Sequence, residues 1–161
     1  MADADGATTP YAMTLDRIAR EIPFAQAFIV TTLPRGGLQV IHERGSDPSW
    51  IRSYSREDHL LDIVAWESLR RGMPQRLAGL RGDSPAGIVN VAKRFQAAAL
   101  SRARITHCLA CPVASPLLEG FIGAIELHRN GGAPGFSAEE TRQLEEIAGG
   151  FSAALDEGRR D

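Results

Sequence analysis

The segment from Ile105 to His128 reads ITHCLACPVASPLLEGFIGAIELH and carries the clearest structural pattern in this sequence. Two runs rich in apolar residues, 105–113 and 121–128, flank a short stretch that ends in Gly120. Apolar runs of this length on either side of a turn signal are typical of a β-hairpin. The segment therefore predicts two neighbouring strands joined by a tight connection.

A long amphipathic helix is expected directly after this hairpin. Ser137 is followed three residues later by Glu140, which is the spacing of a helix N-terminal capping box. The residues after it place one apolar stripe along the helix, made of Leu144, Ile147, Ala148, Phe151 and Leu155. This spacing of three and four residues predicts a helix that buries one face.

The first half of the chain contains a second hairpin and further helices. We expect a short helix capped by Thr14 and stopped by Pro23, strands at 24–33 and 38–43, helices from 50 to 69 and from 84 onward, and an irregular stretch at 77–83. Two hairpins that alternate with helices predict an α+β fold, in which helices cover an antiparallel sheet.

The composition places the chain among globular proteins of single-domain size. It has 161 residues, of which 43% are hydrophobic and 24% are charged. A chain of about this length buries roughly two-thirds of its unfolded surface in one core. We expect a disordered N-terminus at 1–9 and a single domain over 10–158.

Charge, cysteine content and hydropathy limit the partners and the location of the protein. A formal net charge of −2 gives no general attraction for nucleic acid or an anionic membrane. No apolar run approaches the ~18 residues that a membrane span needs. Two cysteines are too few for a disulfide framework, which favours a reducing cytoplasm. We therefore expect a cytoplasmic protein with no direct contact to nucleic acid or membrane.

The second half of the chain resembles the GAF family. The stretch Cys111-Pro112-Val113 and the later Gly120-Phe121-Ile122-Gly123 with its apolar sequel are similar to that family's paired strands. The run from Gly135-Phe136-Ser137 into 144–148 is similar to its final helix. The resemblance implies a GAF-like (PAS-like) sheet with the N- and C-terminal helices packed together. It also implies small-molecule sensing that is transmitted to a fused or separate output domain.

A narrower resemblance connects Trp50, Tyr54 and Asp62 with the autoinducer-binding domains of LuxR-type regulators. In that family a Trp and an Asp hold an acyl-homoserine lactone. This sequence has one residue fewer before Asp62, and Ile63 stands where the family has proline. A shift of one residue on a helix rotates a side chain by about 100°.

The residues expected to bind a ligand are Trp50, Tyr54, Asp62, Trp66 and Cys108. An aromatic wall with a few polar groups suits a small organic molecule. The alternative for the aromatic residues is core packing, and the alternative for Asp62 is exposure to solvent. Cys108 is a candidate for thiol attachment of a chromophore or for a buried structural thiol.

The spacing of the Cys and His residues indicates neither a redox pair nor a metal site. On a strand, Cys108 and Cys111 point to opposite faces with their Cα atoms about 10 Å apart, which is too far for a disulfide. His107 lies about 13 Å from Cys111 along the strand, too far to share one zinc ion. His42, His59 and His128 show no ligand spacing. We expect no metal, no cofactor and no catalytic residue.

These observations predict a non-catalytic sensory domain for signal transduction or transcription regulation. We expect it to bind a small organic ligand and to signal as a homodimer through its terminal helices, with the stripe from Leu144 to Leu155 as the candidate dimer face. One alternative is a dimerisation or interaction domain without a ligand. Another is a thiol-dependent enzyme similar to the free methionine sulfoxide reductases, which have the GAF fold.

Overall fold

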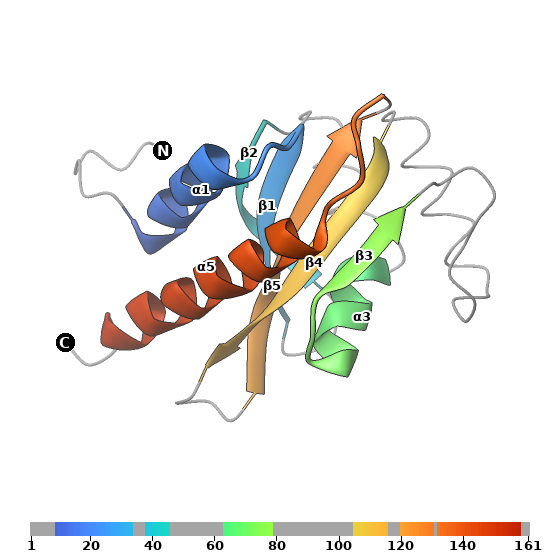
Figure 1. Ribbon diagram of the computed structural model, residues 1–161. Coiled ribbons are helices and arrows are strands. Elements are labelled where there is room, and N and C mark those ends of the chain that lie inside the picture. Colours follow the sequence, from blue (N-terminus) through green and yellow to red (C-terminus); the bar gives the residue numbers. More distant parts are fainter. Residues whose placement is uncertain are drawn as a thin grey trace.

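The computed structural model describes residues 9–33, 38–45, 63–78, 105–115, 120–130 and 132–158. In chain order these residues form α1 (Pro10–Glu21), β1 (Gln26–Thr32), β2 (Leu38–Arg44), α3 (Ile63–Arg71), β3 (Gln75–Ala78), β4 (Ile105–Ser115), β5 (Gly120–Asn130) and α5 (Ala138–Glu157). Figure 1 shows these strands as one sheet between the helices. The predicted helix from residue 84 onward and the predicted helical turns before residue 63 lie outside the described residues.

The described strands form one five-stranded sheet in the order β2-β1-β5-β4-β3. Every neighbouring pair is antiparallel. The two predicted hairpins, β1–β2 and β4–β5, are joined where β1 pairs with β5. The α+β prediction of a single antiparallel sheet is therefore confirmed. The prediction of an irregular stretch from residue 77 is wrong at its start, because Gln75–Ala78 pairs with β4 as the edge strand β3.

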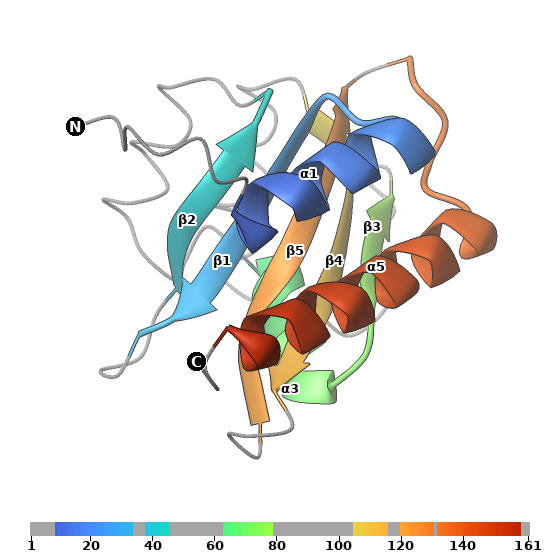
Figure 2. The ribbon, with the colours of Figure 1, turned by 90° about the vertical axis from the view of Figure 1, so that its left-hand side faces the viewer.

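The helices lie on both faces of the sheet. Figure 2 shows α1 and α5 side by side in front of the sheet and α3 behind it. A hydrogen-bonded ion pair of 3.1 Å between Arg17 of α1 and Glu146 of α5 joins the two terminal helices. The predicted packing of the N- and C-terminal helices against each other is therefore confirmed. We call the two sides of the sheet the terminal-helix face and the α3 face.

Each face of the sheet has its own hydrophobic core, because neighbouring residues of a strand point to opposite sides. The core of the terminal-helix face contains Leu15, Ile18, Ile22, Ala27, Ile29, Leu109, Cys111, Val113, Ile125, Leu127, Phe136, Leu144, Ile147, Ala148 and Phe151. The core of the α3 face contains Phe28, Val30, Leu38, Val64, Ala65, Ile105, Cys108, Ala110 and Ala124.

The two terminal helices begin at side-chain caps. Thr9, not the predicted Thr14, is the N-cap of α1, and its side chain accepts a hydrogen bond from the Ala12 backbone N–H. Thr14 lies inside the helix, where its hydroxyl donates to the Pro10 carbonyl. The local signal that distinguishes the two threonines is Pro10, because proline directly after the cap favours the first helical position. The predicted capping box of Ser137 and Glu140 is confirmed at the start of α5.

The apolar stripe of α5 packs inside its own domain. Leu144, Ile147, Ala148 and Phe151 are buried in the core of the terminal-helix face, and Leu155 packs against it. The stripe therefore does not provide the dimer face that the sequence suggested, since the sheet and α1 already cover it. A second copy that paired through α5 would have to contact its outer side, where Gly149 is exposed.

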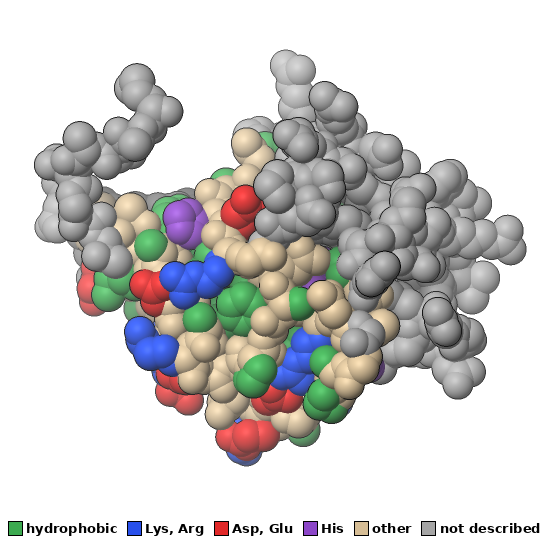
Figure 3. Space-filling model, turned by 90° about the horizontal axis from the view of Figure 1, so that it is seen from above, with side chains coloured by type: hydrophobic (Ala, Val, Ile, Leu, Met, Phe, Trp, Pro, Cys, Tyr) green, Lys and Arg blue, Asp and Glu red, His purple; other side chains and the backbone are tan. Residues whose placement is uncertain are grey.

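The face of the molecule that is seen from above in Figure 3 is mixed in character over the described residues. Seen from above, acidic, basic and hydrophobic side chains are interspersed over the described part of the molecule (Figure 3). Among the described residues, no helix has the length and apolar character required to cross a membrane.

Candidate functional site

Four buried polar side chains meet at the centre of the α3 face. His128 on β5 lies opposite Gln26 of β1 on one side and opposite Cys108 of β4 on the other. Glu126 lies two residues earlier on β5 and therefore shares the face with His128. The exposed fractions are 6% for Gln26 and between 0% and 1% for the other three residues. We call Gln26, Cys108, Glu126 and His128 the buried polar cluster.

Hydrogen bonds hold the His128 imidazole at both nitrogens. The Gln26 amide nitrogen lies 3.1 Å from Nδ1, and Glu126 Oε1 lies 2.6 Å from Nε2. With the amide N–H donating to Nδ1, the proton of a neutral imidazole resides on Nε2 and is donated to the carboxylate. The Phe28 ring packs edge-on against the imidazole with centroids 5.0 Å apart. The orientation of His128 is therefore restricted from three sides.

Cys108 completes the cluster from the neighbouring strand. One potential ligand atom from each of Cys108, Glu126 and His128 lies within 4.8 Å of the other two. Their surroundings are otherwise apolar, since Phe28, Ala65 and Ala110 belong to the same core. Polar groups are costly to bury and need compensating interactions. A concentration of imidazole, carboxylate and thiol in an apolar layer is therefore the most distinctive chemical feature of the described residues.

This cluster was not predicted from the sequence, because only the linear spacing among the histidines was considered there. A signal was available in the motif Glu126-x-His128, since residues i and i+2 of a strand share one face. The contact with Cys108 depends on the β4–β5 register and could not be read from spacing alone.

The predicted ligand-binding residues fall into two groups. Trp50, Tyr54 and Asp62 lie outside the described residues, so their placement stays a prediction. Trp66 on α3 is partly buried and packs against the core that contains Cys108. The structure thus brings Trp66 and Cys108 to the same side of the sheet, with Cys108 inside the buried polar cluster.

Cys111 lies on the other side of the sheet. It is part of the terminal-helix core, whereas Cys108 belongs to the α3 core, so the prediction that the two thiols point to opposite faces is confirmed. Burial, followed by the negative charge of Glu145, raises the pKa of the Cys111 thiol to about 12. The thiolate is the nucleophilic form. Cys111 is therefore protonated and unreactive at neutral pH.

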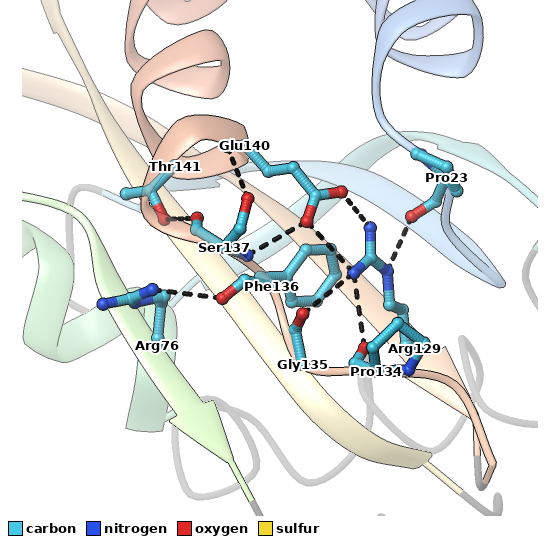
Figure 4. Close-up of polar contacts among 9 residues, drawn as sticks. All are labelled: Pro23, Arg76, Arg129, Pro134, Gly135, Phe136, Ser137, Glu140 and Thr141. Carbon is cyan, nitrogen blue, oxygen red and sulfur yellow. Dashed lines mark hydrogen bonds and ion pairs between the residues drawn. The ribbon is translucent and has the colours of Figure 1, made fainter.

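Arg129, the residue after His128, connects β5 to both terminal helices. Arg129 is 5% exposed, and its guanidinium donates from Nε to the Pro23 carbonyl, 2.8 Å away, just beyond α1. It also donates to the Pro134 and Gly135 carbonyls of the loop that precedes α5. Its carbon Cζ lies 4.1 Å from the centre of the Phe136 ring. We call these contacts, drawn in Figure 4, the Arg129 junction.

The Arg129 junction includes the cap of α5. Both carboxylate oxygens of Glu140 accept from the Arg129 guanidinium, and Oε1 also accepts from the Ser137 backbone N–H at 3.0 Å. Burial alone raises the pKa of this carboxyl, but the bonds from Arg129 and Ser137 outweigh it and leave the pKa below its ordinary value. The first turn of α5 is therefore held to β5 by an ionised carboxylate.

Comparisons with known proteins identify the fold. No family profile and no curated protein sequence matches the chain. A domain assigned to a two-component sensor histidine kinase of Sinorhizobium meliloti superposes with a TM-score of 0.72 at 17% identity, covering 98% of this chain and 96% of that one. The GAF domain/HD domain protein of Geobacter sulfurreducens gives 0.71 at 12% identity, with 94% and 93% covered.

A third structure supports the same assignment. The GAF domain of a two-component sensor histidine kinase from Bacillus halodurans superposes with a TM-score of 0.63 at 14% identity, covering 97% of each chain. At these identities the similarity concerns the fold. The sheet order, the paired terminal helices and these superpositions together show that this chain has the GAF fold.

Proposed function

We propose that this chain is a non-catalytic sensory signalling domain that binds a small organic ligand on the α3 face of its sheet. The observation that carries this proposal is the buried polar cluster, which places an imidazole and a carboxylate within an apolar layer. Binding sites for small molecules combine mostly apolar walls with a few polar groups that orient the ligand. Solved structures with the same fold come from sensor histidine kinases, which supports a signalling role.

The proposed site combines residues from the sheet and from the helical cover. Cys108 and His128 line it from the sheet, and the partly buried Trp66 contributes from α3. Trp50, Tyr54 and Asp62 remain proposed contributors from outside the described residues. A polar group of the ligand would bind at Glu126 and His128, and its apolar part would lie against the aromatic side chains.

The proposed signal passes through β5 to the terminal helices. His128 belongs to the buried polar cluster, and its carbonyl accepts a hydrogen bond of 2.8 Å from Ala25, near the end of α1. The next residue, Arg129, binds the loop before α5 and the α5 cap. A ligand that favours one position of β5 would shift the population of helix arrangements without any chemical step. The outer sides of α1 and α5 would then pair in a homodimer.

A thermal-shift screen against metabolites and acyl lactones tests ligand binding. A ligand that binds only the folded chain raises the melting temperature in proportion to the logarithm of its concentration. The screen contains a chelator, so that metal ions cannot produce the effect. Glu126→Gln should reduce the shift, whereas Cys111→Ser, on the opposite face, should leave it unchanged. Equal shifts in wild type and Glu126→Gln would contradict the proposed site.

The same screen, together with light scattering and an activity assay, tests the two alternatives, a dimerisation domain without a ligand and a thiol-dependent enzyme. A chain that forms a constant dimer by light scattering and responds to no ligand would be a dimerisation domain. The thiol-enzyme alternative would require an ionised thiol, and the raised pKa of Cys111 argues against that residue as nucleophile. Turnover of methionine sulfoxide by the wild-type chain that is lost in Cys111→Ser would overturn the non-catalytic assignment.

A further inference from the structure

We infer that Cys108, Glu126 and His128 form a binding site for a divalent transition metal ion of the zinc class. This goes beyond the proposed function and does not depend on an organic ligand. The three residues are of the types that bind Zn²⁺ in proteins, and their potential ligand atoms lie within 4.8 Å of one another. All three are at most 1% exposed.

The backbone determines this convergence. Glu126 and His128 are alternate residues of β5, and Cys108 is paired with His128 across the β4–β5 ladder. Directly opposite residues of an antiparallel pair hold their Cβ atoms about 4.5–5.5 Å apart. The ligand set is therefore carried by β5, the central strand of the sheet, and by its neighbour β4.

Small side-chain rotations would complete the coordination geometry. Tetrahedral zinc has bonds of about 2.0–2.3 Å to nitrogen, oxygen and sulfur, which places adjacent ligand atoms roughly 3.3–3.6 Å apart. Glu126 Oε1 and His128 Nε2 are now 2.6 Å apart and would separate by less than about 1 Å to admit the ion.

Gln26 supplies the outer contact that a metal-bound imidazole needs. A histidine ligand nearly always donates its second ring N–H to a neighbouring oxygen. The Gln26 side-chain amide lies 3.1 Å from Nδ1. A half-turn of the amide would present its oxygen to Nδ1–H, leaving the Nε2 lone pair for the metal. Gln26 is therefore the positioning residue of the site.

Charge balance favours the metal-loaded state of this buried site. The Cys108 thiolate and the Glu126 carboxylate together carry two negative charges, and a divalent cation cancels both. Binding releases the thiol proton to solvent, while the imidazole stays neutral and its one proton moves from Nε2 to Nδ1, where the rotated Gln26 amide oxygen accepts it. The mixed sulfur, nitrogen and oxygen donors select zinc-class ions over Mg²⁺ or Ca²⁺, which prefer oxygen ligands alone. Three ligands from the described strands leave one position of a tetrahedral ion for a further group.

Cobalt titration of the full chain tests this site directly. The chain is first unfolded with a chelator to remove bound metal, and the chelator is then removed. In one series Co²⁺ is present while the chain refolds. In a second series the chain refolds without metal and is titrated with Co²⁺ afterwards. We expect thiolate-to-cobalt charge-transfer absorption and the d–d bands of a four-coordinate ion, both saturating at one equivalent. Zn²⁺ should abolish both signals by competition and should raise the melting temperature. A wild-type chain without these bands, or with the bands of a six-coordinate ion, would overturn the inference.

Matched variants assign the ligands. Cys108→Ser should remove the charge-transfer band and weaken Zn²⁺ binding by more than about 100-fold, whereas Cys111→Ser should behave as wild type. Gln26→Leu should weaken binding by about 10–100-fold, as loss of an outer contact does. Circular dichroism verifies folding, and Glu126→Gln and His128→Asn replace Cys108→Ser if that variant is unfolded. Wild-type affinity in all three ligand variants, or a lost band in Cys111→Ser, would refute the site.

The metal titration contains no organic ligand and the ligand screen contains chelator, so each can fail without the other.

Discussion

The two faces of the sheet differ in where they bury polar side chains. On the terminal-helix face, the centre of the core is apolar, and the buried polar contacts lie toward the ends of the strands, at the Arg129 junction and at the Ser115–Asp156 hydrogen bond. On the α3 face, the buried polar cluster spans the three central strands. We infer that the first face mainly supplies stability and that the second carries the chemistry.

The peptide that links His128 to Arg129 connects the α3 face of the sheet with the terminal-helix face. The two side chains point to opposite sides of β5, one into the buried polar cluster and the other into the Arg129 junction. Since a strand is rigid over two residues, a displacement on one face has to be accommodated on the other.

Truncation in the terminal-helix core should have the largest effect on stability. Leu144→Ala removes a side chain that is 0% exposed and should lower the free energy of unfolding by about 2–5 kcal/mol, measured by denaturant titration. The same substitution at Leu33, which is 39% exposed, should cost less than about 1 kcal/mol. Similar losses for the two variants would show that α5 is not firmly packed on the sheet.

Removal of the Arg129 guanidinium should have the second-largest effect on the free energy of unfolding. Arg129→Met leaves the Glu140 carboxylate and three carbonyls without their donor and should cost about 2–4 kcal/mol. Arg142→Met, which breaks the exposed pair with Glu139, should cost no more than about 0.5 kcal/mol. Thermal unfolding of both variants provides the measurement. If Arg129→Met lowers the free energy of unfolding as little as Arg142→Met does, the Arg129 junction does not contribute substantially to stability.

Neutralising Glu140 should have a smaller, pH-dependent effect. Glu140→Gln should lose about 1–2 kcal/mol at pH 7, because a charged hydrogen bond becomes neutral. The folded pKa of Glu140 lies below its unfolded value, so its contribution is complete above about pH 4.3 and is lost as pH falls through the folded pKa. The melting temperatures of wild type and variant should therefore converge as the pH falls below about 4.3 and passes through the folded pKa. If the difference in melting temperature stays constant as the pH falls, the charge of Glu140 is not the cause of the stability difference.

The exposed pair between the terminal helices should contribute least. Arg17→Ala breaks the contact with Glu146, whose side chain is 75% exposed, and should cost less than about 1 kcal/mol. Because salt screens exposed charges, the difference from wild type should shrink further at about 1 M salt. A larger cost that resists salt would show that this pair helps to hold α1 against α5.

Much of the fold could be predicted because local patterns specify it. The apolar run 121–128 after Gly120 and the capping box at Ser137 predicted β5 and α5 close to their observed positions. Two features were missed. The edge strand Gln75–Ala78 is too short for a periodic pattern to stand out, and it forms by pairing with β4. The Thr9 cap of α1 had a local signal, because Pro10 follows it at the first helical position, and this signal was overlooked.

Local sequence patterns specify the alternation of hairpins and amphipathic helices, and with it the α+β class and the opposite orientation of Cys108 and Cys111. The row of Gln26, Cys108 and His128, and the binding of Arg129 to the ends of both terminal helices, come from the folded arrangement of the strands. Periodicity in a sequence indicates which face of an element a side chain takes. The partner it meets there depends on strand order and register, which are set by contacts between segments far apart in the chain.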